Sequence, residues 1–179
     1  MSAVVQVESG GNPLALHDNT LRQSYAPESQ AEAIDWATQL IGFGHSVDLG
    51  LSQINSANLP MLAMSVAQAF DPCTNLRGGA RILGEDYTAA AGRFGPGQYA
   101  LRRALAAYNS GSFFASQAYV NEILVAAGVP PETAEAPTTG TAGQSNGRGK
   151  RAAPQPTPEP PYTIERVAGS PVVVIDGTP

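Results

Sequence analysis

The chain has 179 residues, of which 42% are hydrophobic and only 14% are charged, and its net charge is −5. This length and apolar content are enough for one globular core of ordinary size. Its only lysine is Lys150, so it lacks the clustered cations of a nucleic-acid-binding surface. No apolar run approaches the roughly 18 to 20 residues of a membrane span, and no signal peptide opens the chain.

The first 42 residues are expected to hold two helices. An apolar run at residues 3–7 leads to Glu8, and the turn sequence Ser-Gly-Gly-Asn-Pro follows at once. We therefore expect the first helix to end at this glutamate. Ser29 and Glu32 form a capping box before a second helix, which Gly42 terminates.

A short, glycine-punctuated segment then interrupts the helical pattern. Residues 45–58 (HSVDLGLSQINSAN) are predicted to form an irregular or β-like insertion. Pro60 is expected to open a third helix that continues to Phe70, because apolar residues recur there at a spacing of four. Asp71-Pro72 ends that helix. His17 and His45 are interpreted as solvated or hydrogen-bonded loop residues.

Three more helices are expected before residue 129. Their apolar faces carry Leu76, Ala80, Leu83, Tyr87 and Ala91 in the first, Leu101, Leu105 and Tyr108 in the second, and Val120, Ile123, Leu124 and Ala127 in the third. Gly95-Pro96-Gly97 separates the first two. Residues 1–129 are thus predicted to form one mainly α domain.

Composition changes sharply after this domain. Residues 130–179 hold 10 of the 15 prolines, a Thr/Gly/Ser-rich stretch and the run PQPTPEPPY. Such a tail buries too little apolar surface to offset its chain entropy, so we expect it to be disordered. Its last apolar stretch, SPVVVIDG, is expected to be loose, with an edge strand as the alternative.

Three polar segments are the candidates for chemistry. They are ESGGNP from residue 8, GLSQIN from residue 50 and AYNSG from residue 107. Each places neutral hydrogen-bonding groups beside glycines, which suits a sugar ligand. One carboxyl among such groups stays protonated near neutral pH if apolar residues desolvate it, as a general acid requires. No metal-ligand cluster and no cofactor motif accompanies them.

In this order the three segments resemble the soluble lytic transglycosylase family, which has a lysozyme-like fold. ESGGNPLALHDN, GHSVDLGLSQINSANL, DPCTNLRGGARIL and ALAAYNSG are most similar to the VirB1-type branch of type IV secretion and conjugation systems. The likeness covers about residues 3–127. It implies a periplasmic enzyme that acts on peptidoglycan glycan strands, with secretion-system components as possible partners of the tail.

The resemblance also implies roles for individual residues. Glu8 would be the catalytic acid and base. Ser9, Gln53, Tyr108 and Asn109 would bind or position the substrate, although backbone-bonding or core roles also fit each of them. No second acid lies in the three motifs, and Asp48, which lies beside the second motif, would be a hydrogen-bonding support of the loop. The family reaction is therefore expected, in which the C6 hydroxyl of N-acetylmuramic acid attacks intramolecularly and forms a 1,6-anhydro end.

Alternatives remain open at this stage. A goose-type lysozyme would hydrolyse the same bond with water. A non-catalytic assembly factor would only bind the glycan, and a passive domain would only carry the tail. Seven residues before Glu8 are few for this family, so an N-terminal truncation is expected. Cys73 is interpreted as a buried thiol, or as a cysteine whose disulfide partner lies in a missing segment.

Overall fold

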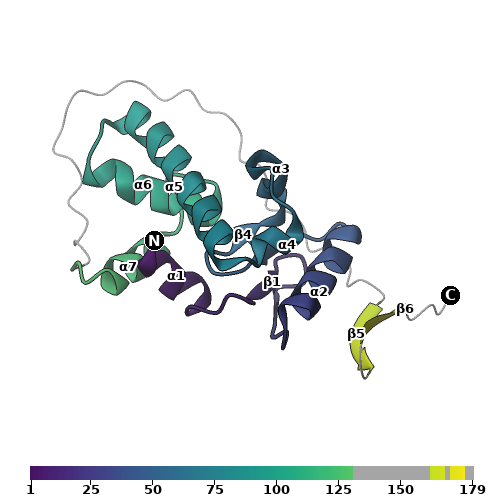
Figure 1. Ribbon diagram of the computed structural model, residues 1–179. Helices are drawn as coiled ribbons and strands as arrows, with labels where there is room; N and C mark the ends of the chain where they lie inside the picture. Colours follow the sequence, from purple (N-terminus) through teal and green to yellow (C-terminus); the bar gives the residue numbers. More distant parts are fainter. Residues whose placement is uncertain (131–161, 168–169, 176–179) are drawn as a thin grey trace.

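The computed structural model describes residues 1–130, 162–167 and 170–175 (Figure 1). Most of the expected disordered tail, residues 131–161, lies outside this description. In the described part the main helices follow the order that the sequence predicts. They are α1 (Ser2–Ser9), α2 (Gln30–Gly42), α5 (Pro72–Phe94), α6 (Gln98–Ser110) and α7 (Gln117–Ala126).

Local sequence explains where two of these helices begin. The Ser29 side chain accepts a hydrogen bond from the backbone N–H of Glu32, which caps α2. Asp71 caps α5 in the same way through Thr74, and Pro72 occupies its first turn. Gly10, in a left-handed conformation with φ 61°, ends α1 directly after Ser9.

A small antiparallel sheet lies between the helices. Its strands are β1 (Leu16–Asp18), β2 (Gln23–Tyr25), β3 (Val47–Leu49) and β4 (Ile54–Asn55), in the order β2-β1-β3-β4. The β-like insertion predicted at residues 45–58 is confirmed, since β3 and β4 lie within it. β1 and β2 were not predicted, because their short polar sequences carry no clear alternation.

The helix predicted from Pro60 to Phe70 is wrong as a single element. The structure has a 3₁₀ turn, η1 (Ser56–Asn58), and two one-turn helices, α3 (Leu59–Leu62) and α4 (Val66–Ala69). Ala63 adopts a left-handed conformation with φ 50° and stops α3. Ser65 and Gln68 then form a capping box that starts α4. The apolar residues recur at a spacing of four because α3 and α4 both pack their apolar side chains into the same core.

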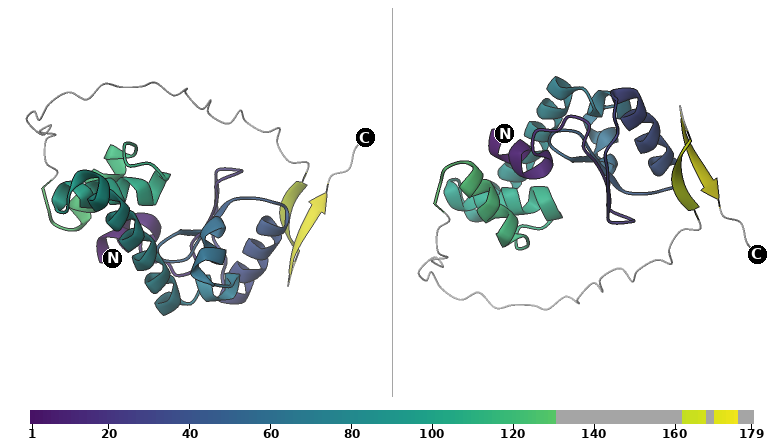
Figure 2. Two further views of the ribbon diagram at one scale, coloured as in Figure 1. Left: turned by 90° about the horizontal axis from the view of Figure 1, so that it is seen from above. Right: turned by 90° about the horizontal axis from the view of Figure 1, so that it is seen from below.

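The long helix α5 connects two hydrophobic cores. One core joins α2, the sheet and α4 around Leu40, Leu49 and Phe70. The other joins α1, α6 and α7 around Val4 and Val120. Figure 2 shows α2 and the sheet on one side of the molecule and α6 and α7 on the other, with α5 running between them.

The two histidines are both hydrogen-bonded, but only one is in a loop. His17 lies in β1, and its Nδ1 is 2.9 Å from Ser24 Oγ. His45 is 8% exposed and pairs with the fully buried Asp18, with Nδ1 2.6 Å from Oδ2. The second Asp18 oxygen accepts the N–H groups of Thr20 and Leu21. This pair fastens the loop before β3 to the end of β1.

Cys73 corrects another expectation. Its thiol is free and exposed, not buried, because the residue lies on the solvent side of the first turn of α5. A disulfide partner outside this chain remains a prediction.

The apolar C-terminal stretch is also different from the expected loose tail. β6 (Ser170–Ile175) pairs antiparallel with β5 (Tyr162–Val167) to form a separate two-stranded sheet. Three consecutive valines with high β-propensity, Val172 to Val174, explain why this stretch is a strand. No helix in the described residues is both long and apolar enough to cross a membrane.

Candidate active site

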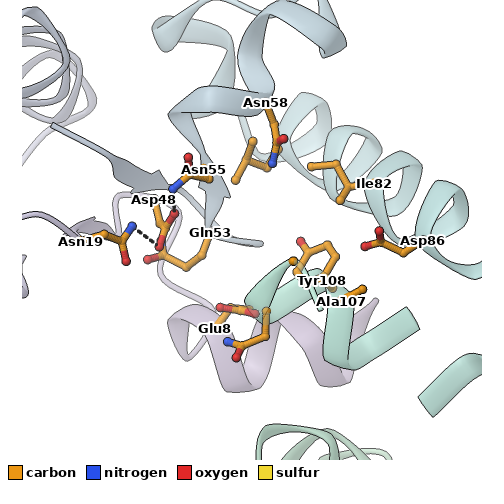
Figure 3. A pocket seen from close by; sticks show the side chains of 13 residues that line it. Glu8, Asn19, Asp48, Gln53, Asn55, Asn58, Ile82, Asp86, Ala107 and Tyr108 are labelled. Carbon is orange, nitrogen blue, oxygen red and sulfur yellow. Dashed lines mark hydrogen bonds between the residues drawn. The ribbon is translucent and has the colours of Figure 1, made fainter. Parts of the chain in front are cut away.

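A cleft of about 380 Å³ opens between the sheet, α5 and α6, and the carboxyl end of α1 reaches its floor (Figure 3). It brings together all three of the polar segments singled out in the sequence. The residues that line it are Glu8, Asn19, Asp48, Gln53, Ile54, Asn55, Asn58, Ile82, Asp86, Ala107, Tyr108, Asn109 and Gly111. None of these lining residues carries a positive charge.

Glu8 lies at the end of α1, as the sequence predicts, and is half-buried. Its Oε1 accepts a hydrogen bond from the Tyr119 hydroxyl at 2.5 Å. Tyr119 belongs to α7, which packs against α1. The carboxyl group is therefore held by a residue of a neighbouring helix that lies 111 positions away in the sequence.

The environment of Glu8 favours its protonated form. Burial raises its pKa from an ordinary value of 4.5 to about 7. The hydrogen bond from Tyr119 acts in the opposite direction, and the negative charge of Asp48 adds a smaller increase. At neutral pH the group is poised between acid and base, which is the condition for general acid–base work.

Tyr108 lines the cleft from α6. Its hydroxyl donates to the backbone carbonyl of Ser52 at 2.7 Å. Burial first, and the charge of Glu8 second, raise the pKa of both Tyr108 and Tyr119 above the ordinary phenol value. Both hydroxyls are therefore protonated donors at neutral pH. Tyr108 has its expected place beside Glu8, but the direct bond to the carboxyl comes from Tyr119.

The GLSQIN segment is shaped by one buried side chain, Asn75 of α5. Its Oδ1 accepts from the backbone N–H of Ser52 at 2.8 Å and from the Ser52 hydroxyl at 2.5 Å. Its Nδ2 donates to the carbonyls of Leu49 and Ala69. Asn75 is 1% exposed, so all these bonds are shielded from water.

Two glycines let this segment sit directly on α5. A Cβ atom at Gly79 would lie 2.4 Å from Ser52 Oγ and 3.0 Å from the Tyr108 hydroxyl. A Cβ atom at Gly50, whose φ is +70°, would lie 2.5 Å from Asn75 Nδ2. Any side chain at either position would push the cleft wall away from the helix.

Gln53 and Asn109 both line the cleft, as predicted, and both brace it. Gln53 has a left-handed backbone with φ 47°, and its Nε2 donates to the carbonyls of Gly50 and Ala15. Such strain in a non-glycine residue is typical of functional sites. Asn109 Oδ1 accepts from Ser116 Oγ at 2.7 Å, which fixes the loop after α6.

Ser9 is placed differently from the other predicted residues. It is not among the residues that line the cleft. Its hydroxyl donates to the Leu51 carbonyl at 2.7 Å and lies 3.1 Å from the Val5 carbonyl, and it accepts from the N–H of Gly11. The backbone-bonding role is therefore the one observed. Ser9 connects the end of α1 to the GLSQIN segment.

Two further carboxylates line the cleft. Asp48 accepts from Asn19 Nδ2 at 2.8 Å and from Asn55 Nδ2 at 2.7 Å, which matches its expected role as a loop support. Asp86 was not predicted. It lies on α5, one turn after Ile82, on the far side of the cleft from Asp48 (Figure 3). Among the described residues, no group of three or more histidine, cysteine, aspartate or glutamate side chains could hold a metal ion.

Sequence reasoning missed Tyr119, Asn75 and Asp86. Tyr119 precedes Val120 in an apolar helix and resembles a core aromatic. Asp86 resembles any solvated helix carboxylate. Asn75 carries a weak signal, because a polar residue three positions before a Gly-Gly pair, on a helix with an apolar face, suggests a close backbone approach.

The mainly α fold, the small sheet and the cleft agree with the comparison with known families. The model of the transglycosylase SLT domain matches residues 1–122. The chain therefore belongs to this family and has its lysozyme-like fold.

Among its relatives is Protein virB1 of Agrobacterium fabrum, 41% identical over 139 residues, which are 75% of this chain and 56% of the relative. Type IV secretion system protein virB1 of Brucella abortus is 40% identical over 72% of this chain and 58% of its own length. Protein virB1 of Rhizobium radiobacter is 36% identical over 71% of this chain and 54% of its own. The chain thus spans little more than half the length of these relatives. No solved structure matches it significantly.

Proposed function

We propose that this protein is a lytic transglycosylase that cleaves the bond between N-acetylmuramic acid and N-acetylglucosamine in peptidoglycan. The observation that supports this most directly is the half-buried Glu8 carboxyl, whose pKa is raised to about 7, at the floor of a cleft lined mostly by uncharged side chains. Membership in the SLT family adds independent support.

Glu8 acts twice in the proposed reaction. Its protonated carboxyl first gives its proton to the glycosidic oxygen as the bond from this oxygen to C1 of the muramic acid breaks. The resulting carboxylate then takes the proton of the C6 hydroxyl of the same sugar, while the C6 oxygen bonds to C1. The products are a 1,6-anhydro end and a free N-acetylglucosamine hydroxyl, and Glu8 regains its proton.

The neighbours of Glu8 divide the remaining work. The Tyr119 hydroxyl orients the carboxyl and stabilises it when it is ionised. Tyr108, Gln53 and Asn109 line the cleft and are proposed to contact the sugar rings and their N-acetyl groups. Ser9 is proposed as a positioning residue, because its hydroxyl fastens α1 to the opposite wall.

The hydrolytic alternative gains one argument from Asp48. It accepts hydrogen bonds from two side-chain amides, and its negative charge contributes to the raised pKa of Glu8. A second carboxylate of this kind would serve as base for a water molecule in a lysozyme. In the transglycosylase mechanism Asp48 only supports its loop. The two mechanisms therefore predict different effects of the Asp48→Asn substitution.

Mass spectrometry of digested peptidoglycan separates the reactions. The proposal expects anhydro ends from the wild type, no release by Glu8→Gln, and residual anhydro release by Asp48→Asn. If the wild type releases fragments with reducing ends and Asp48→Asn does not, the reaction is hydrolysis. A wild type that sediments with peptidoglycan yet releases no more than Glu8→Gln would identify a non-catalytic binding factor.

The names of the relatives support a proposal about the setting of the activity. The Brucella relative is named a type IV secretion system protein. We propose that the present protein opens the cell wall locally for such an apparatus, in the periplasm, and that the proline-rich segment after residue 130 contacts secretion components. Deleting residues 131–179 should then impair secretion or conjugation while the purified protein keeps its activity on peptidoglycan.

A further inference from the structure

Asp86 is the one carboxylate of the cleft for which the structure provides no hydrogen-bond donor among the described residues. Glu8 accepts from Tyr119, and Asp48 accepts from two amides. The nearest cation along α5, Arg81, bonds to Glu85 instead, at 2.9 Å on the exposed face of the helix.

The position of Asp86 makes this lack of a donor significant. It is half-buried and lines the cleft, so part of its hydration is lost. That burial, followed by the charge of Glu85, raises its pKa, which means that the ionised form is not compensated in the free protein. A donor on a bound ligand would supply the missing partner.

The surrounding charges select the kind of donor. The cleft contains the carboxylates Asp48 and Asp86 beside the carboxyl group of Glu8, and its described lining has no cationic side chain. Its potential is therefore negative and attracts a positive group. A bond between ionised partners is also stronger than one to a neutral hydroxyl.

Ile82 and Asp86 together resemble one half of a sugar subsite. Both lie on the same face of α5 and line the cleft opposite Asn19 and Asp48 (Figure 3). Ile82 offers an apolar surface for a ring face, and Asp86 offers an acceptor for a substituent one helical turn away. The carboxylate whose charge contributes to the raised pKa of Glu8 is Asp48, on the opposite wall of the cleft from Asp86.

We propose that Asp86 forms a subsite for a primary ammonium group of the wall polymer, and that it makes the protein prefer such material over its fully N-acylated form. The ammonium group comes either from a de-N-acetylated glucosamine or from a free amine of the stem peptide. The inference rests on the proposed function for the identity of the polymer, and it adds a specificity that the proposed reaction does not require.

The test measures binding, so that it does not depend on turnover. In a Glu8→Gln background, calorimetry compares glucosamine oligosaccharides with N-acetylglucosamine oligosaccharides of the same length. It also compares muropeptides whose stem amine is free with the same muropeptides after acetylation. Additional Asp86→Asn and Glu85→Gln substitutions form the matched pair, because Glu85 is the adjacent carboxylate and does not line the cleft.

The expected result is about ten-fold tighter binding of one amine-bearing ligand, which corresponds to about 1.4 kcal/mol. Asp86→Asn should abolish that preference, and Glu85→Gln should keep it. Which ligand pair shows the preference identifies the source of the amine. Equal binding within both pairs, or a preference that survives Asp86→Asn, would overturn the proposal.

The two proposals can fail separately. Anhydro products from the wild type without any preference that depends on Asp86 would leave the reaction standing and remove the ammonium subsite. A preference that depends on Asp86, in a protein that releases no fragments, would support the ammonium subsite and contradict the proposed reaction.

Discussion

Replacing Glu8 by glutamine should stabilise the protein at neutral and alkaline pH. The carboxyl is half-buried, and folding raises its pKa from 4.5 to about 7. Well below pH 4.5 it is protonated in both the folded and the unfolded chain, so folding does not change its charge. As the pH rises toward 7, the unfolded chain releases this proton more readily than the folded one, and the free energy of unfolding falls.

The magnitude follows from the size of the pKa change. Each pH unit is worth about 1.36 kcal/mol, so ionised Glu8 destabilises the fold by at most about 3 kcal/mol above pH 7. Water in the open cleft screens part of this effect. Glutamine carries no charge, and its amide oxygen keeps an acceptor for Tyr119. For a domain of this size the gain corresponds to a rise in Tm of up to roughly 10 °C.

Thermal unfolding of the wild type and Glu8→Gln between pH 4 and pH 9 measures this effect. The difference in Tm should be small at pH 4, grow between pH 4.5 and 7, and then stay constant. Glu85→Gln, which removes an exposed carboxylate, serves as the control and should show no such rise. A Glu8→Gln protein that is less stable than the wild type at pH 8, or a difference independent of pH, would refute the assigned burial of Glu8.

Further predictions concern the activity and the cleft wall. Activity of the wild type should fall about ten-fold per pH unit above pH 7, as Glu8 loses its proton. Tyr119→Phe removes the bond that lowers the pKa of Glu8, so this alkaline limit should move to higher pH while the rate at pH 6 drops. Gly79→Ala should cost about 1 to 3 kcal/mol of stability and reduce activity, since its Cβ would lie 2.4 Å from a neighbouring side chain. Gly84→Ala on the same helix has open space and should gain up to about 1 kcal/mol, measured by urea unfolding. Asn75→Ala should cost about 2 to 5 kcal/mol, because it leaves several buried groups without partners.

The parts of the fold that the sequence predicts well are those with local causes. The cap at Ser29, the break at Asp71-Pro72 and the turn that follows α1 mark helix ends through contacts a few residues apart. Glu8, Gln53, Tyr108 and Asn109 were placed in one cleft because their motifs resemble a family, and the structure does bring these four together. Their catalytic and binding roles stay predictions.

What the sequence did not predict depends on distant contacts. The bond from Tyr119 joins residues 111 positions apart, and no periodicity within α7 indicates it. The burial of Asn75 depends on how closely the GLSQIN segment approaches α5. The break between α3 and α4 reflects the local strength of one capping box, which outweighed an apolar spacing that also fitted a continuous helix.

The packing of α1 against α7 also has a consequence for biosynthesis. A ribosome makes Glu8 more than a hundred residues before it makes Tyr119, the side chain that holds it. During that interval α1 has no α7 to pack against, and the Glu8 carboxyl lacks the hydrogen bond from the Tyr119 hydroxyl. Only when α7 has emerged and packed against α1 is the Glu8 carboxyl held as it is in the folded domain. The raised pKa of Glu8 is therefore a property of the complete domain and not of α1 alone.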